Sequence, residues 1–333
     1  HRISQGQLRY DLVMKSAPPV TIVTPSYNQA PFLEQTILSV LEQDYPNLEY
    51  FVVDGASTDA SLEIIQKYAH RITWWVSEKD NGQADAINKG LRRASGDVIA
   101  WINSDDYYLP GAIQMAVQAL QENPSASFVY GDVQVVNEKD ELINILRYGN
   151  WGLKELMSFH IIGQPAVFIR RAALQKAGYL DLSYQFLLDH QLWLRLALHG
   201  GMTHVPQLWA GAHYHAGSKN MAQAALFGNE AQRIVQWMEA TPEFASLYTQ
   251  NSRRICAGAE RLNAFYLFDA QDYRASLDAY LRSLALHPAA AAQDWYRILF
   301  AALSPLGLDQ LKKAHLARRK KRLKSFRPPF TRK

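Results

Sequence analysis

The sequence contains a single cysteine, Cys256, and no uncharged apolar run long enough to cross a membrane. One cysteine excludes an internal disulfide and fits a reducing compartment. The lack of a long apolar run excludes a membrane-spanning helix. The first residues also lack the charged-then-apolar layout of a signal peptide, so export is not expected. These absences predict a cytoplasmic protein whose contact with a membrane is at most peripheral.

Two motifs that hold phosphates on backbone amides are also missing. The sequence has no G-x-G-x-x-G and no G-x-x-x-x-G-K-[ST]. Both motifs place phosphate oxygens at the N-terminus of a helix, where unpaired N–H groups point at the ligand. Their absence excludes the usual dinucleotide and Walker sites. If this protein binds a diphosphate, a different kind of binding site must hold it.

The composition is that of a folded protein, but its charge is divided unevenly. Hydrophobic residues make up 48% and charged residues 20% of the 333 residues, which excludes a disordered chain. Residues 312–333 carry 11 Lys or Arg and no acid, which leaves 24 basic against 31 acidic residues before them. The basic tail predicts either a solvated terminus or a peripheral contact with an anionic membrane. A nucleic-acid partner is not expected, because no stacking platform or recognition-helix pattern accompanies the tail.

Strand and helix patterns alternate through the first third of the chain. The expected strands are Val20–Thr24, Tyr50–Val53, Ile72–Val76 and Val98–Ile102, and the expected helices are Pro31–Leu41, Ser61–Tyr68 and Ala84–Ala94. This alternation predicts a parallel sheet with helices on both faces. Between about residues 128 and 215 the patterns predict a mixed sheet. After residue 219 helical patterns dominate, and Gln271–Pro288 resembles one tetratricopeptide unit.

Polar clusters follow three of the expected strands. They are Pro25-Ser26-Tyr27-Asn28, Asp54-Gly55-Ala56-Ser57-Thr58-Asp59 and Asn103-Ser104-Asp105-Asp106. Ligands of open α/β sheets bind at the carboxyl ends of the strands, although each cluster alone is also typical of turns and helix caps. The oxygen-rich third cluster suits a hard cation such as Mg²⁺ or Mn²⁺ that contacts phosphate oxygens. The sequence therefore predicts a metal-assisted diphosphate site at this edge.

At these residues the sequence resembles the family 2 glycosyltransferases, inverting enzymes of the GT-A fold. Four blocks carry the resemblance between about residues 19 and 220, in the family's order: TIVTPSYNQAPFLEQTILSVLEQDYPNLEYFVVDGASTD, SEKDNGQADAINKGLRRASGDVIAWINSDDYYLPGA, GQPAVFIRRAALQKAGYLD and LLDHQLWLRL. The resemblance implies an open mixed α/β sheet flanked by helices, with an all-helical C-terminal extension. It also implies transfer of a sugar from a nucleotide-diphosphate sugar, with UDP favoured, to a glycan or lipid-linked acceptor hydroxyl.

The resemblance also divides the chain and assigns the nucleotide pocket. Residues 1–17 form an N-terminal extension, 18–220 the transferase domain, 221–311 a helical region with the tetratricopeptide-like unit, and 312–333 the basic tail. Tyr27 is expected to stack on the base, Asp54 to accept from a base N–H, and Pro25 and Asn28 to shape the pocket. Further donor contacts are expected from Gln83, Asp85, Asn103, Ser104, Asp106 and Gln164.

The metal site is expected to depart from the family pattern. The resemblance implies Asp105 as the metal ligand, while Asn103 stands where an Asp is common and gives the site less charge. His215, Ser218 and Lys219 match a mobile loop over the diphosphate, on which Lys219 donates to phosphate and His215 completes the metal shell. The alternative for His215 is a histidine packed at the edge of the sheet. Ile87 replaces a family Arg, so Gln83 or Lys89 is expected to supply that contact.

Asp189 matches the second position of the family's E-D motif, which supplies the general base, and Leu188 replaces the preceding Glu. As a base, Asp189 takes the proton of the acceptor hydroxyl during attack opposite the leaving diphosphate, and configuration inverts. The alternative is that Asp189 is a helix N-cap. Asp132 is a weaker candidate for an acceptor contact.

A second function stays open at this point. Asn103, Leu188 and the repeat-like unit suggest a catalytically weak nucleotide-sugar-binding or scaffold protein of a polysaccharide assembly complex. Turnover of nucleotide sugars separates the two hypotheses.

Overall fold

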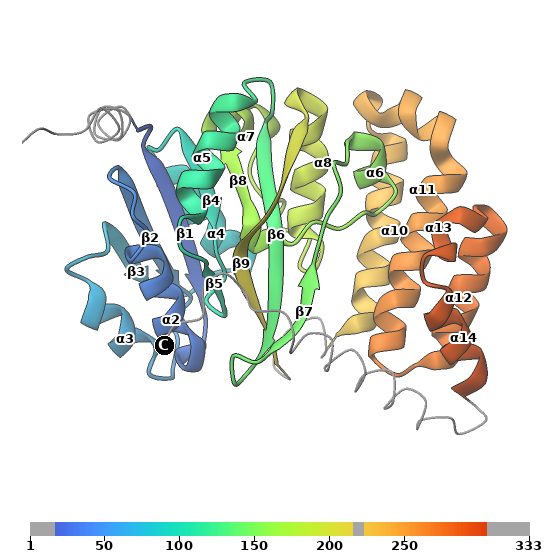
Figure 1. Ribbon diagram of the computed structural model, residues 1–333, viewed down its shortest axis with the longest axis horizontal. Coiled ribbons are helices and arrows are strands. Elements are labelled where there is room, and N and C mark those ends of the chain that lie inside the picture. Colours follow the sequence, from blue (N-terminus) through green and yellow to red (C-terminus); the bar gives the residue numbers. More distant parts are fainter. Residues whose placement is uncertain (1–16, 216–222, 305–333) are drawn as a thin grey trace, which may run out of the picture.

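The computed structural model describes residues 17–215 and 223–304, and the described part is built on one nine-stranded sheet (Figure 1). The strands are β1 (Val20–Ser26), β2 (Leu48–Asp54), β3 (Trp74–Ser77), β4 (Val98–Trp101), β5 (Asp106–Tyr108), β6 (Phe128–Asn137), β7 (Leu142–Leu146), β8 (Val167–Arg170) and β9 (Met202–Tyr214). Their order is β3-β2-β1-β4-β8-β6-β9-β5, with β7 paired to β6.

The sheet is parallel in its first half and mixed in its second. Strands β3, β2, β1 and β4 are parallel, whereas β8 runs antiparallel to both β4 and β6. Strand β9 is parallel to β6, and β5 is antiparallel to β9. The predicted change from a parallel to a mixed sheet is therefore confirmed. The carboxyl ends of β1, β2, β3 and β4 meet at one edge, as the strand-end rule requires.

Helices cover both faces of the sheet. They are α2 (Ala30–Leu41), α3 (Ser61–Tyr68), α4 (Gln83–Arg93), α5 (Ala112–Glu122), α6 (Leu153–Met157), α7 (Arg171–Ala177) and α8 (Leu188–Gly200), with the short 3₁₀ helix η1 (Gln164–Ala166). Helices α2, α3 and α5 pack on one face and α4, α6, α7 and α8 on the other. Successive residues of β2 alternate between the two cores: Phe51 faces α4, and Val52 faces α2 and α3. Such strands are apolar on both faces, which is typical of buried parallel sheets.

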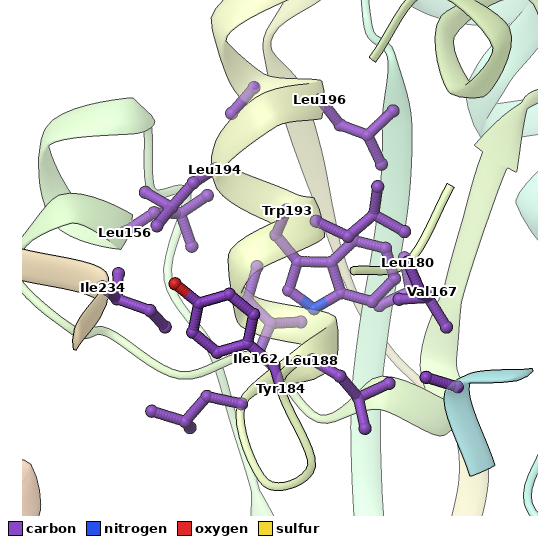
Figure 2. Close-up of a cluster of buried hydrophobic side chains, with 14 of the residues drawn as sticks. Leu156, Ile162, Val167, Leu180, Tyr184, Leu188, Trp193, Leu194, Leu196 and Ile234 are labelled. Carbon is purple, nitrogen blue, oxygen red and sulfur yellow. The ribbon is translucent and has the colours of Figure 1, made fainter. Parts of the chain in front are cut away.

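The core beneath α8 surrounds the Trp193 ring with aliphatic side chains (Figure 2). Trp193 of α8 is fully buried, and its ring stacks on Trp101 of β4 at 5.2 Å and on Phe128 of β6 at 5.4 Å. Ile234 belongs to the same cluster but lies in a C-terminal helix. The C-terminal helices therefore share the core of the sheet.

The C-terminal region is helical throughout its described residues. It consists of α10 (Ala224–Ala240), α11 (Pro242–Asp269), α12 (Tyr273–Leu286), α13 (Pro288–Ala292) and α14 (Trp295–Leu303), gathered at one end of the molecule in Figure 1. Ser276 and Ser283 of α12 each donate a hydroxyl hydrogen bond to a carbonyl of α11 at 2.8 Å, so these helices pack closely. This arrangement confirms the predicted helical extension. The domain boundaries and the tetratricopeptide likeness stay predictions.

None of the described helices is long and apolar enough to cross a membrane. The basic tail, residues 312–333, lies outside the described residues, and so does the predicted N-terminal extension apart from Ala17.

Candidate functional site

Hydrogen bonds tie together the loops that follow β1, β2 and β3. Asn28 adopts a left-handed backbone conformation with φ of 52°, and its side-chain oxygen accepts from the Thr58 N–H at 2.8 Å. The Asn28 N–H donates to Ser57 Oγ at 2.8 Å. The Asp54 carboxylate accepts from the Ser57 N–H at 2.9 Å and from Ser77 Oγ at 2.6 Å. One buried carboxylate therefore organises the edge at which three strands end.

The four predicted nucleotide residues divide into an exposed pair and a buried pair. Tyr27 is 60% exposed and Asn28 is exposed beside it, so the Tyr27 ring is available for stacking. Pro25 is buried within β1, and Asp54 is fully buried. The Asp54 carboxylate accepts from serine donors in this structure and thereby fixes the loop after β2. Acceptance of a base N–H by Asp54 stays a prediction.

A polar network follows β4. Asn103 accepts from Gln83 Nε2 at 2.8 Å and donates to Asp106 at 3.2 Å. Asp106 is buried, and both this burial and the neighbouring charge of Asp105 raise the pKa of Asp106. The neutral Asn103 can donate to that buried carboxylate, which an Asp in the same place could not do while ionised. The departure at Asn103 therefore has a structural reason.

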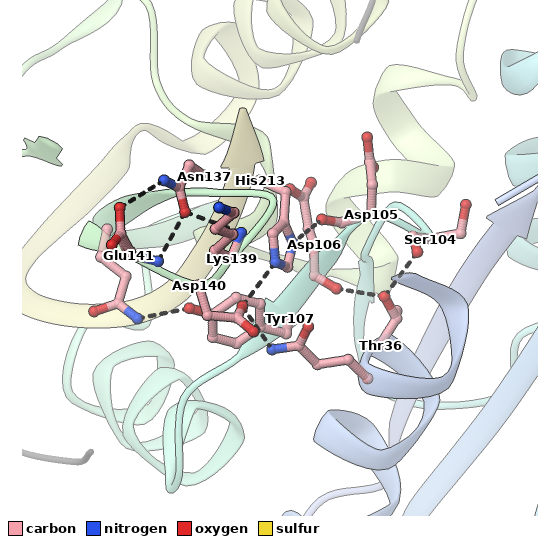
Figure 3. A network of polar contacts seen from close by, with 12 residues as sticks. Thr36, Ser104, Asp105, Asp106, Tyr107, Asn137, Lys139, Asp140, Glu141 and His213 are labelled. Atoms are coloured by element: carbon pink, nitrogen blue, oxygen red, sulfur yellow. Dashed lines mark hydrogen bonds and ion pairs between the residues drawn. The ribbon is translucent and has the colours of Figure 1, made fainter. Parts of the chain in front are cut away.

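Helix α2 anchors the same loop from below (Figure 3). The buried Thr36 hydroxyl contacts the Ser104 carbonyl at 3.0 Å and the Asp106 carbonyl at 2.6 Å. These contacts hold the backbone on both sides of Asp105. Its side chain remains 22% exposed, which leaves it accessible to a ligand.

Two histidines at the end of β9 meet the Asp105 loop. His215 Nε2 lies 3.2 Å from Asp105 Oδ2, and this hydrogen bond is the largest cause of a raised pKa of His215. His213 Nδ1 contacts the Asp105 carbonyl at 2.6 Å, and its Nε2 contacts Asp140 at 2.9 Å (Figure 3). The Phe32 ring packs against both imidazoles. His215 is thus packed at the edge of the sheet and also joined to the predicted metal ligand.

The donor set fits a divalent cation that is only partly bound by protein. A carboxylate oxygen and an imidazole nitrogen are both ligands that Mn²⁺ accepts, and Mg²⁺ accepts the carboxylate. Among the described residues no group of three or more His, Cys, Asp or Glu side chains is arranged to hold an ion. Within the described residues, Asp105 and His215 are therefore the pair that could contribute to a cation site, with water and substrate oxygens as further ligands. Ser218 and Lys219, predicted to contact phosphate, lie outside the described residues.

Asp189 lies in the first turn of α8, but it is not the cap. The N-cap is Leu187, and Asp189 accepts from the His190 N–H at 2.7 Å. The alternative that Asp189 is an N-cap is therefore wrong, because the chain is already helical at Leu188. Burial raises the pKa of Asp189 to about 6, and the charge of Glu230 adds to this shift. A carboxylate with this pKa is suited to accept a proton near neutral pH.

The start of α8 faces the carboxyl end of β4. Trp193, one turn after Asp189, stacks on Trp101, the last residue of β4. Gln164 Nε2 of η1 donates to the Trp101 carbonyl at 2.8 Å. The buried side-chain oxygen of Gln164, Oε1, has no hydrogen-bond partner in the described part of the chain. Helix α8 and η1 therefore both contact Trp101, four residues before Asp105.

The remaining predicted residues near α4 have structural partners. Asp85 accepts from the Asn81 backbone and side-chain N–H groups at 3.0 and 3.2 Å, which shapes the turn into α4. Lys89 forms an ion pair with Glu78 at 2.6 Å. Ile87 is fully buried in the core. Of the two proposed substitutes for the missing Arg, Gln83 lies in the Asn103 network and Lys89 does not.

Asp132 is internal and lies within a strand and not after one, and its contact with an acceptor stays a prediction. It is 2% exposed, lies within β6, and bonds to His204 Nε2 at 2.8 Å and to the Tyr148 N–H at 3.1 Å. A buried carboxylate needs such partners. Sequence reasoning missed His204, Thr36 and Glu230, because each acts on residues more than 40 positions away and leaves no local pattern.

The sequence of this chain is similar to sequences of known proteins. Residues 21–176 match the model of the family described as glycosyl transferase family 2. An uncharacterized glycosyltransferase of Mycobacterium tuberculosis is 30% identical over 191 residues, covering 56% of this chain and 71% of the relative. The Escherichia coli UDP-Glc:alpha-D-GlcNAc-diphosphoundecaprenol beta-1,3-glucosyltransferase WfgD is 29% identical over 178 residues, covering 53% of this chain and 69% of the relative.

The fold also resembles a solved structure over most of its length. The mannosyltransferase PcManGT from Pyrobaculum calidifontis, in complex with GDP-Man and Mn²⁺, superposes with a TM-score of 0.53 at 23% identity. The match covers 90% of this chain and 94% of that chain. The helical C-terminal region is therefore largely included in the likeness.

Proposed function

This chain belongs to glycosyl transferase family 2, and from this premise we propose that it moves a sugar from a nucleotide-diphosphate sugar to an acceptor hydroxyl with a divalent cation. The contact of Asp105 with His215 at 3.2 Å carries the proposal. Manganese in the complex of the mannosyltransferase supports the choice of cation. The E. coli relative WfgD is a glucosyltransferase that acts on UDP-Glc and alpha-D-GlcNAc-diphosphoundecaprenol, which supports a UDP sugar as donor and a lipid-linked or glycan acceptor.

The donor is expected to lie across the carboxyl edge of the sheet. Tyr27 stacks on the base, and the loop held by Asn28 and Ser57 bounds the pocket. The diphosphate reaches the Asp105 loop, whose backbone is held by Thr36. Asp105 and His215 would hold the cation there, and a bound cation would supply positive charge that stabilises the departing diphosphate.

Asp189 acts as the general base in this proposal. Its carboxylate accepts the proton of the acceptor hydroxyl while that oxygen attacks the anomeric carbon. The new glycosidic C–O bond forms on one face as the C–O bond to the diphosphate breaks on the other, so configuration inverts. The pKa of Asp189, raised to about 6 by burial, supports this role. A hexose is the expected sugar.

Turnover of a donor panel tests the proposal. The full chain is incubated with UDP and GDP sugars, a lipid-diphosphate-linked sugar acceptor and Mn²⁺, and nucleotide release is followed. A UDP sugar is expected to turn over, with loss of activity in EDTA and recovery on addition of Mn²⁺. Thermal stabilisation by a nucleotide sugar without any turnover would favour the binding or scaffold protein instead.

The pH dependence of transfer provides a further prediction. Because Asp189 must be ionised to accept a proton, kcat/KM is expected to fall about tenfold per pH unit below the pKa of Asp189, which burial raises to about 6. An ordinary carboxylate would place this limb near pH 4. Initial rates between pH 4.5 and 8, with folding checked by circular dichroism, measure the limb. A flat profile down to pH 5 would contradict the assignment.

A further inference from the structure

A buried carboxylate from the C-terminal helices holds the loop that leads to Asp189. Glu230 of α10 is 6% exposed. Its Oε1 accepts from the Gln185 N–H at 2.6 Å, and its Oε2 accepts from the Phe186 and Leu187 N–H groups at 2.9 and 2.8 Å. Asp189 follows Leu187 by two residues.

These three bonds explain why a charge is buried at Glu230. An isolated buried carboxylate is costly, whereas charge-assisted hydrogen bonds from three backbone N–H groups offset much of that cost. Three consecutive N–H groups reach one carboxylate only when the backbone curls around it. Glu230 therefore specifies the path of the loop as it enters α8.

The same face of α10 makes two more contacts with this loop. Phe227, three residues before Glu230, packs on Phe186 with ring centroids 5.0 Å apart. Arg233, three residues after Glu230, donates to the Ser183 carbonyl and hydroxyl, both at 3.0 Å, and lies 4.7 Å from the Tyr184 ring. Residues three apart share one side of a helix. Side chains from a single face of α10 thus contact residues 183–187.

We propose that this face, formed by Phe227, Glu230 and Arg233, positions Asp189 for catalysis, with Glu230 as its central positioning residue. The inference rests on the proposed role of Asp189 as the base. A base must be aimed closely at the reacting hydroxyl, and a misplacement of about 1 Å can cost about 100-fold in rate. The C-terminal helices then contribute to catalysis by fixing the loop that leads to Asp189.

Among the described residues, Glu230 is the charge that shifts the pKa of Asp189. Glu230 approaches from α10, His190 follows on α8, and Tyr266 of α11 and Tyr148 after β7 lie within electrostatic range. Burial chiefly raises the pKa of both tyrosines and lowers the pKa of His190, so all three side chains are uncharged at neutral pH. Removal of the Glu230 charge should therefore lower the pKa of Asp189.

The test is Glu230→Gln in the full chain. We expect kcat to fall about 10- to 100-fold, with the donor KM unchanged and the acid limb of the pH profile displaced to lower pH. The matched control is Glu260→Gln, since Glu260 of α11 accepts from Gln232 of α10 at 3.1 Å and from Arg282 of α12 at 3.0 Å, and these partners lie outside the loop that leads to Asp189. This control should keep the wild-type kcat and acid limb. General destabilisation of the helices would affect both variants alike and would not move the limb.

A second variant decides the matter if Glu230→Gln does not fold. Arg233→Lys keeps the charge at an exposed site but loses the paired bonds to Ser183, so kcat should fall several-fold with the donor KM and acid limb unchanged. Wild-type kcat in Glu230→Gln, or in Arg233→Lys where the first variant is unfolded, overturns the inference. Asp189→Asn separates the two levels of the argument. If Asp189→Asn keeps its activity, Asp189 is not the base. If Asp189→Asn is inactive while Glu230→Gln has the wild-type kcat, only the positioning role of Glu230 is contradicted.

Discussion

Replacement of Asp189 by asparagine is expected to lower kcat about 10²- to 10⁴-fold, the range that general-base catalysis contributes. The amide keeps the shape of the side chain and can still accept from the His190 N–H. It cannot accept the proton of the acceptor hydroxyl. Donor binding, followed by thermal shift with a UDP sugar and Mn²⁺, should stay at the wild-type level, because Asp189 is assigned to the acceptor.

The same substitution should not reduce stability. Burial raises the pKa of Asp189 to about 6 from an ordinary value of 3.8, so the fold disfavours its ionised form. The stability linked to this group is present below its unfolded pKa and is lost as the pH rises through the folded pKa. At pH 7 the loss is at most about 3 kcal/mol, and asparagine avoids it.

Urea unfolding at pH 7 measures this effect. The free energy of unfolding of Asp189→Asn should equal or exceed that of the wild type, and the gain should shrink at pH 5. Asp278→Asn, on an exposed position of α12, is the matched control and should change neither kcat nor stability. A variant that is both inactive and strongly destabilised would instead mark Asp189 as a structural residue.

Replacement of Asp105 by asparagine is expected to lower kcat/KM about 100-fold or more, since even the partners of metal ligands are each worth about 10- to 100-fold. The amide removes the negative charge that faces His215 and leaves a weak neutral ligand. The requirement for Mn²⁺ should shift to much higher concentrations. Titration of Mn²⁺ by electron paramagnetic resonance, with and without UDP, measures the affinity directly.

The opposite end of β4 supplies the control for Asp105. Asp97 precedes the strand, is exposed, and pairs with Arg171 at 3.5 Å. Asp97→Asn loses one exposed ion pair, which is worth at most about 1 kcal/mol, and should retain full activity. If Asp105→Asn showed the wild-type dependence on Mn²⁺, Asp105 would not be a metal ligand.

Local pattern accounts for much of the agreement between sequence and structure. The alternation of strands and helices predicted the parallel half of the sheet, and the start and end of α3 match the expected residues. The polar clusters after β1, β2 and β4 were found because the ends of parallel strands must meet. Where bounds differ, as at β3, which begins at Trp74 and not at Ile72, the strand starts only where it pairs with Phe51 of β2.

The sequence by itself determined the fold class, the edge of the sheet that carries the polar clusters, and the candidacy of Asp105, Asp189 and Tyr27. The fold class and this edge follow from short-range periodicity and from polar clusters after the strands, whereas the candidacy of the three residues follows from the resemblance to family 2 glycosyltransferases. Tertiary structure alone decided that Asp54 is buried, that Asp132 pairs internally, that His215 reaches Asp105, and that Glu230 grips the loop before α8. The physical reason is that the hydrogen bonds of Asp132, His215 and Glu230 join residues from 43 to 110 positions apart in the sequence. Such pairings leave no trace in local composition.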